Sequence, residues 1–287
     1  MIIEPELHFF KAPSPHLLKG YHDIAYYQWG DENNKDVVLC VHGLSRNARD
    51  FDYLASHLAK DFRVICIDIV GRGKSQWLEF SEIYNYTTYT NDIIELLKHL
   101  AIKNVNWVGT SMGGIIGMLV TAQYPQYIKR LILNDIGPLI PGKSLQRIIK
   151  YVGTNTSFAT LEQAKSALKT KMTTFGINDD MHWDHIFKHS LMQKDGKYHY
   201  SYDPKIVDQN MIGVKIDDID MWPIWKNITC PTMIIRGDKS DVLLAGTYSK
   251  MQKSSFVEQA HEFENIGHAP HLMESNQINI IASWLTK

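Results

Sequence analysis

Apolar residues recur along this chain in two alternating patterns. Short continuous apolar runs are typical of strands that are buried on both faces of a sheet. Longer segments carry apolar residues at spacings of three and four, which predicts amphipathic helices. The expected strands lie at 22–29, 37–41, 64–67, 106–109, 131–133, 233–235 and 262–266, and the expected helices include 48–59, 90–100, 244–251 and 276–285. Strands that alternate with helices predict an α/β fold with a mostly parallel sheet, in which 22–29 is an outer strand.

The alternation stops after Gly137 and resumes at Pro231. Between these points the helical spacing recurs at 145–152, 161–172 and 183–191. The dipeptide Asp195-Gly196 predicts a turn before a short hairpin or extended loop, and Pro223 is expected to break any helix around it. We therefore predict a core domain and a mainly helical cap insertion, with boundaries at 1–137 and 230–287 for the core and 138–229 for the cap.

Length, composition and charge narrow the possible functions. A chain of 287 residues, 44% of them hydrophobic, can bury the core of an enzyme-sized globule. Its formal net charge of −1 argues against nucleic acid or an anionic membrane surface as the main partner. No apolar run approaches the length of a membrane span, and the acidic first residues do not resemble a secretory signal. We expect a cytoplasmic protein that acts on a small-molecule substrate without a cofactor or metal. The oligomeric state is left open.

One short motif predicts the reaction chemistry. An apolar run ends at Gly109, and a helical pattern begins directly after Ser111-Met112-Gly113. This Gly-x-Ser-x-Gly arrangement between a strand and a helix is typical of a nucleophile elbow. The glycines permit a sharp turn that raises the Ser111 hydroxyl above the sheet, at the N-terminus of the helix.

An acidic residue and a histidine follow this serine in the order Ser, Asp, His. Asp241 lies in the loop after the strand at 233–235, and His268 follows the strand at 262–266. Because the carboxyl ends of parallel strands meet at one edge of a sheet, we expect both residues to lie near Ser111. Acyl transfer through a serine needs a base and a carboxylate that orients the base, together with donors for the oxyanion.

Five motifs in this order resemble the α/β-hydrolase superfamily over nearly the whole chain. They are His42-Gly43-Leu44, Asp68-x-x-Gly71-x-Gly73-x-Ser75, the elbow at Ser111, the acid loop 237–241 and Gly267-His268. The resemblance is to lidded, esterase-like serine hydrolases. It implies a catalytic triad of Ser111, Asp241 and His268. It also implies an oxyanion hole formed by the backbone amides of Leu44 and Met112.

Several assignments have rivals. Asp135 and Asp238 compete with Asp241 for the role of the acid, since some family members place the acid after the strand that follows the nucleophile, and Asp238 could instead cap a turn. His271 competes with His268 for the role of the base. His42 is expected to support the oxyanion loop and to border the substrate pocket.

The cap is expected to determine the substrate. Phe175, Trp183 and Trp222 are candidates for an apolar pocket, although aromatic residues at helical spacing also pin caps to their domains. The histidines of the third cap helix, His182, His185 and His189, are expected to line a surface or groove rather than to bind zinc. The predicted reaction is hydrolysis of a carboxylic ester. Hydrolysis of a C–C bond or a lactone is a second possible reaction, and a ligand-binding sensor that retains the triad is a third possible function.

Overall fold

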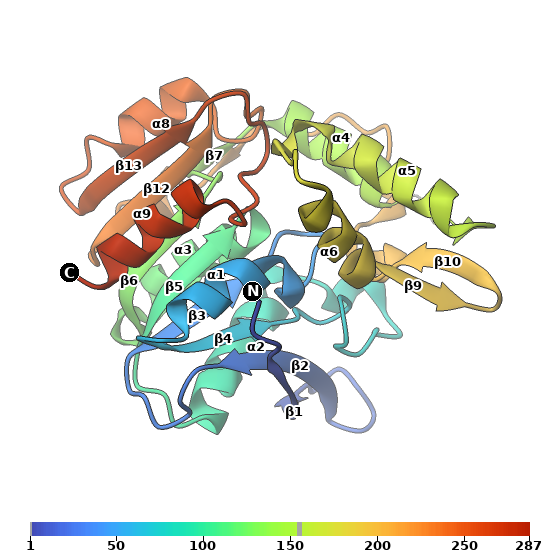
Figure 1. Cartoon of the computed structure of the whole chain (residues 1–287), viewed down its shortest axis with the longest axis horizontal. Coiled ribbons are helices and arrows are strands. Elements are labelled where there is room, and N and C mark those ends of the chain that lie inside the picture. Colours follow the sequence, from blue (N-terminus) through green and yellow to red (C-terminus); the bar gives the residue numbers. More distant parts are fainter. Residues whose placement is uncertain (1, 154–156) are drawn as a thin grey trace.

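The computed structural model describes residues 2–153 and 157–287. Its centre is an eight-stranded sheet in the order β1-β2-β4-β3-β5-β6-β12-β13, parallel from β4 to β13 (Figure 1). The strands are β1 (Glu6–Pro13), β2 (Tyr21–Trp29), β3 (Val37–Val41), β4 (Arg63–Ile67), β5 (Val105–Thr110), β6 (Ile128–Asn134), β12 (Thr232–Gly237) and β13 (Val257–Phe263). This confirms the predicted α/β class and the mostly parallel sheet.

Helices cover both faces of the sheet because the central strands are apolar on both faces. All residues of β3 are buried: Val38 and Cys40 belong to one apolar layer, and Leu39 and Val41 to the other. Helices α1 and α9 contribute to the first layer, and α2, α3 and α8 to the second (Figure 1). The bounds are α1 (Asp52–Leu58), α2 (Tyr86–His99), α3 (Met112–Gln123), α8 (Ala245–Met251) and α9 (Ser275–Leu285).

Two sequence expectations fail at the edges of the sheet. The strand at residues 22–29 is not the outer one, because β1 pairs with it in antiparallel register and forms the edge. The last strand, β13, begins and ends earlier than the expected 262–266. As an edge strand that is only partly buried, β13 lacks the apolar run by which the inner strands are recognised.

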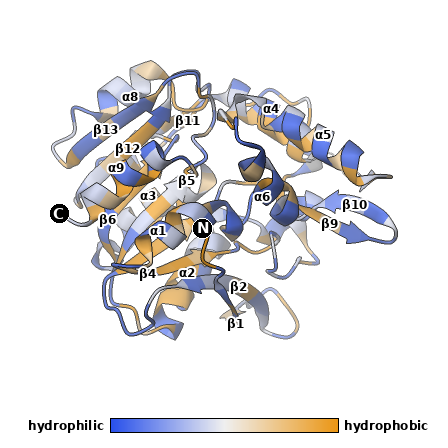
Figure 2. Ribbon diagram, in the orientation of Figure 1, coloured by the Kyte–Doolittle hydropathy of each residue, from blue (hydrophilic) through white to orange (hydrophobic). Residues whose placement is uncertain are grey.

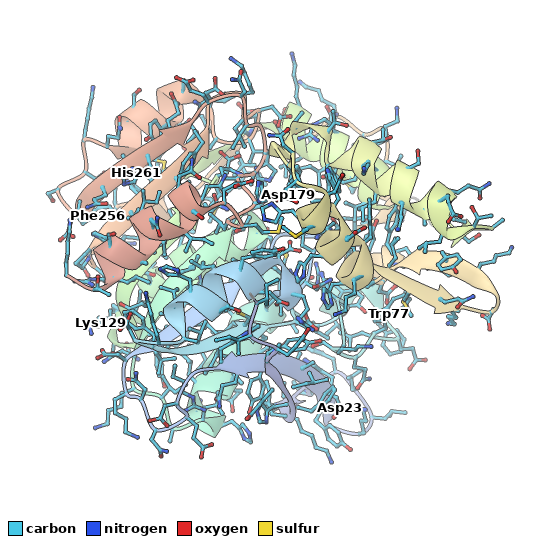
Figure 3. All side chains as sticks on the ribbon, in the orientation of Figure 1. Asp23, Trp77, Lys129, Asp179, Phe256 and His261 are labelled. Atoms are coloured by element: carbon cyan, nitrogen blue, oxygen red, sulfur yellow. The ribbon has the colours of Figure 1, made fainter. Side chains whose placement is uncertain are left out.

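The segment between β6 and β12 is mainly helical, and most of its elements lie beside the sheet rather than in it (Figure 1). Its elements are β7 (Leu139–Ile140), α4 (Gly142–Val152), β8 (Ser157–Phe158), α5 (Leu161–Lys171), α6 (Asp180–Ser190), β9 (Leu191–Lys194), β10 (Lys197–Tyr200), β11 (Ile219–Asp220) and α7 (Trp222–Trp225). Strands β7 and β11 pair with each other, so the two ends of the segment meet. Figure 3 labels Asp179, whose carboxylate caps the N-terminus of α6.

The turn signals in this segment had different outcomes. Asp195 and Gly196 connect β9 and β10 with positive φ angles, which confirms the hairpin. Pro223 does not break a helix, since it lies in the first turn of α7. That position tolerates proline because its N–H would have no intrahelical partner.

The hydropathy pattern matches this arrangement. Figure 2 shows hydrophobic residues concentrated along the central strands, whereas β10 is largely hydrophilic. Among the helices that the structure describes, none is both long and apolar enough to cross a membrane.

Candidate active site

Ser111 lies in a sharp turn between β5 and α3. Its φ of 52° and ψ of −115° belong to a region that residues other than glycine rarely adopt. Two glycines allow the close packing that this turn needs. A Cβ atom at Gly113 would overlap the carbonyl oxygen of Val41, and one at Gly109 would overlap the carbonyl oxygen of Gly113. The local sequence therefore holds the Ser111 hydroxyl at the N-terminus of α3.

A continuous hydrogen-bonded chain joins Ser111, His268 and Asp135. The Ser111 hydroxyl donates to His268 Nε2 at 2.8 Å, and His268 Nδ1–H donates to Asp135 Oδ2 at 2.7 Å. A carboxylate can only accept, so the proton of the neutral imidazole lies on Nδ1 and Nε2 is free to accept. The side chains of His268 and Asp135 are 9% and 0% exposed, so little water competes with these bonds.

Asp135 follows the last residue of β6 and is held by the neighbouring strand β12. The backbone N–H of Gly237 donates to its Oδ1 at 3.0 Å, and the Ser240 hydroxyl donates to its Oδ2 at 2.5 Å. Together with His268, three donors fix a fully buried carboxylate. Charge-assisted bonds of this kind offset the cost of removing the carboxylate from water.

The prediction that Asp241 orients His268 is wrong. The Asp241 carboxylate forms a fork with Arg147 of α4, with both N–O distances at 2.8 Å, and the two side chains are each 47% exposed. The loop after β12 directs Ser240 inward to Asp135 and turns Asp241 outward to Arg147. Asp135 bonds His268 instead, because β6 lies beside both β5 and β12.

Asp238 and His271 have structural contacts of their own. Asp238 pairs with Lys239 at 2.9 Å and accepts a bond from the Ile266 N–H at 3.2 Å, as expected of a turn cap. His271 Nδ1 accepts from the Met273 N–H at 3.3 Å, and burial lowers the pKa of His271 to about 4. Neither residue contacts Ser111 through a hydrogen bond in the described part of the chain.

The amides of Leu44 and Met112 lie where the oxyanion hole is expected, after β3 and directly after Ser111. Within the described residues neither N–H donates a hydrogen bond. His42 fixes the first of them indirectly, because its Nδ1–H donates to the Gly43 carbonyl oxygen at 2.7 Å. In a trans peptide that carbonyl and the Leu44 N–H point in opposite directions. The bond that fixes the Gly43 carbonyl therefore also fixes the direction of the Leu44 N–H.

His42 is a neutral, buried support for this loop. Its Nε2 accepts from the Ile69 N–H at 3.0 Å, and burial lowers the pKa of His42 to about 3. Its ring also borders the cavity at Ser111, so both expected contacts are present.

A largely apolar cavity opens at Ser111 and His268. Its apolar lining comes from both the core and the inserted segment and includes Leu44, Phe51, Ile148, Met172, Phe175, Ile186, Leu272 and Met273. Phe175 is thus where the sequence predicted it. Sequence reasoning missed Arg46 and Tyr151, which also line the cavity. Arg46 follows the His42-Gly43-Leu44 motif by two residues, which is a signal that could have identified it.

Trp183 and Trp222 are not among the residues that line this cavity, so the pocket prediction is wrong for both. Trp183 stacks on Phe187, and its Nε1–H donates to the Ile177 carbonyl oxygen at 3.2 Å. The Trp222 ring packs edge-on against Trp225 and lies 3.8 Å from Lys250 Nζ. Both tryptophans pin the inserted segment together or to the core.

One group of side chains has the donor set for a cation. Ligand atoms of Asp52, His185 and His189 lie within 4.8 Å of one another. Arg49 Nε already bonds both Asp52 oxygens, at 2.9 and 2.8 Å, and His185 Nε2 bonds the Arg49 carbonyl oxygen at 2.8 Å. The Arg49 guanidinium beside Asp52 opposes a second positive charge, and we assign no metal to this group.

The fold and the proteins similar to this chain define its class as that of a hydrolase. A family model for the alpha/beta hydrolase fold matches residues 36–274, and the chain therefore belongs to the α/β-hydrolase family.

Similar proteins agree with this assignment. The chain is 33% identical to a 3-hydroxybutyrate-oligomer hydrolase from Cupriavidus necator, over 100% of this chain and 99% of that protein. Among solved structures, a putative hydrolase from Rickettsia typhi is 39% identical with a TM-score of 0.90, covering 98% of this chain and 99% of the other. An alpha/beta hydrolase from Novosphingobium aromaticivorans is 33% identical with a TM-score of 0.86, covering 100% and 99%.

Proposed function

We propose that this protein is a serine hydrolase that cleaves carboxylic esters through an acyl-enzyme intermediate. The observation that carries the proposal is the bonded chain of Ser111, His268 and Asp135 beside the backbone amides of Leu44 and Met112, which donate no hydrogen bond to the described residues. An activated serine hydroxyl, an oriented imidazole and oxyanion donors are the groups that acyl transfer requires.

In the first half of the proposed reaction, Ser111 Oγ attacks the ester carbonyl carbon and its proton passes to His268 Nε2. The carbonyl oxygen becomes an oxyanion, which the N–H groups of Leu44 and Met112 stabilise. One such donor typically contributes about 3–4 kcal/mol in the transition state. The imidazolium, stabilised by Asp135, then protonates the departing alkoxide oxygen. The C–O bond breaks and leaves an acyl group on Ser111.

In the second half, a water molecule replaces the alcohol. His268 Nε2 takes one proton from the water as its oxygen attacks the acyl carbon. The tetrahedral intermediate collapses, the bond to Ser111 Oγ breaks, and His268 returns the proton to Ser111. The products are one carboxylic acid and one alcohol, and no cofactor takes part in either step.

For the substrate class we propose short oligoesters of hydroxy acids. The support is the full-length similarity to the 3-hydroxybutyrate-oligomer hydrolase of Cupriavidus necator. An apolar cavity at Ser111 is compatible with a short branched or linear acyl chain.

Turnover of two esters tests the proposal. We expect the wild-type protein to hydrolyse p-nitrophenyl butyrate and the 3-hydroxybutyrate dimer, and Ser111→Ala to abolish both activities. A fluorophosphonate should add 1:1 to Ser111, as located by peptide mass spectrometry. Binding of ester without turnover would instead favour a sensor, and turnover that persists in Ser111→Ala would refute the assigned nucleophile.

A further inference from the structure

A second cavity adjoins the cavity at Ser111 and extends beneath the inserted segment. The two share Ser45, Arg46, Tyr151, Met172 and Phe175 in their linings. The second cavity, here called the side cavity, is completed by Leu168, Lys171, Ser190, Tyr200 and Tyr202. These residues come from α5, α6, β10 and the turn that follows it, so separate elements converge on one space beside the catalytic cavity.

Lys171 brings an ammonium group without a carboxylate partner to the side cavity. Its Nζ donates to the Tyr151 carbonyl oxygen at 2.9 Å and lies 3.9 Å from the centre of the Tyr200 ring. No ion pair involves Lys171 among residues 2–153 and 157–287. Burial lowers the pKa of Lys171 to about 8 and raises that of Tyr200 to about 12, so the lysine is charged and the phenol neutral at pH 7.

Two buried hydroxyl groups of the side cavity also lack a partner. The residues Ser190 and Tyr200 are 3% and 6% exposed, and neither hydroxyl makes a hydrogen bond within the described chain. Buried polar groups are nearly always bonded, so each exception calls for a physical reason. Two hydroxyl donors beside an uncompensated ammonium are a donor set for an anion.

The charge balance agrees with this interpretation. The Arg46 guanidinium, which borders both cavities, is neutralised by Asp50, with N–O distances of 2.8 and 2.5 Å. Lys171 therefore leaves the side cavity with one uncompensated positive charge. A partly buried ammonium without a counter-ion is costly, and a bound anion would offset that cost.

We propose that the side cavity binds a free carboxylate of the substrate while the scissile ester lies at Ser111. Lys171 would pair with the carboxylate, and the Ser190 and Tyr200 hydroxyls would donate to it. This inference rests on the proposed ester hydrolysis and narrows it to esters with a carboxylate on the alcohol portion. The acid end of a hydroxy-acid oligomer has that chemistry.

The experiment compares the 3-hydroxybutyrate dimer with its methyl ester, in which methylation removes the charge of the carboxylate, and follows only cleavage of the internal ester, which releases methyl 3-hydroxybutyrate from the methylated dimer. Hydrogen bonds to charged groups contribute about 1.5–3 kcal/mol, so we expect wild-type kcat/KM to be about 10- to 100-fold higher for the dimer. Lys171→Met should remove most of this ratio through KM, and Lys171→Arg should retain much of it. Lys169→Met, an exposed lysine on the same helix, is the matched control and should keep the wild-type ratio.

A binding measurement separates this inference from the proposed function. In a Ser111→Ala background, calorimetry should show the dimer binding about 10- to 100-fold more weakly after Lys171→Met, whether or not the wild type turns it over. Equal kcat/KM for dimer and methyl ester, or an equal loss for both in Lys171→Met, would overturn the carboxylate site while leaving ester hydrolysis intact. Absence of any Ser111-dependent hydrolysis would refute the proposed function itself.

Discussion

The substitution Asp135→Asn tests how the site works, because it removes one charge and preserves the side-chain shape. The Gly237 N–H donates to Oδ1, and this bond favours the orientation that leaves the Asn amide nitrogen facing His268. An amide nitrogen donates only, so His268 Nδ1 would have to accept and its proton would move to Nε2. Nε2 could then no longer take the proton of Ser111.

The structure also gives a magnitude. The carboxylate contacts the imidazole at 2.7 Å, so the charge centres of an ion pair would lie about 4 Å apart. At an effective dielectric constant of about 20 this pair is worth about 4 kcal/mol to the imidazolium, or roughly 10³-fold in rate. The unfavourable tautomer adds to this loss. We expect kcat to fall by about 10⁴-fold, as for the corresponding change in serine proteases.

The assay is steady-state hydrolysis of p-nitrophenyl butyrate, with circular dichroism to show that the variant is folded. Asp241→Asn is the matched control. It breaks only a half-exposed ion pair with Arg147, which is worth at most about 1 kcal/mol of stability, and it should keep near-normal rates. Near-normal rates for Asp135→Asn together with a large loss for Asp241→Asn would refute the assignment of the acid.

Three other expectations concern the backbone and pH. Gly113→Ala should prevent folding or abolish activity, because its Cβ would overlap the Val41 carbonyl oxygen. Gly246→Ala is the control: the space around Gly246 is open, so the melting temperature should stay equal or rise. A folded, active Gly113→Ala would contradict the expected overlap. An unfolded histidine gains a proton below its ordinary pKa of 6.5, whereas native His42, with a pKa of about 3, does not. The contribution of His42 to the free energy of unfolding should therefore fall by about 2 kcal/mol from pH 6.5 to 5. Urea titrations should show that the free energy of unfolding depends less on pH in His42→Gln than in the wild type. Lys171 loses its charge above its pKa of about 8, so the preference for the dimer over its methyl ester should vanish by pH 9.5 in wild type and persist in Lys171→Arg.

Local sequence determined much of the fold and two of the three central side chains. The apolar runs identified the inner strands because those strands are buried on both faces, and the elbow was visible because only glycine fits beside Ser111. His268 was found because it follows the last strand of the sheet. Edge strands such as β1 and β13 were missed or shifted, since one exposed side leaves no apolar run.

Which aspartate bonds His268 was decided by tertiary structure. Asp135 and Asp241 both follow strands whose carboxyl ends lie beside β5 or one strand away, so strand order allows either residue to reach His268. The inward turn of Ser240 and the position of Arg147 in the inserted segment select Asp135, and neither is written in a local pattern.

The same holds for the cavities. Their linings combine residues from the core and from α4, α5 and α6, which meet only in the folded chain. The sequence by itself determined the sheet and singled out Ser111 and His268, because each depends on neighbours along the chain. The bond from His268 to Asp135, the lining of the cavities and the position of Lys171 depend on contacts between distant segments, and only the tertiary structure could show them.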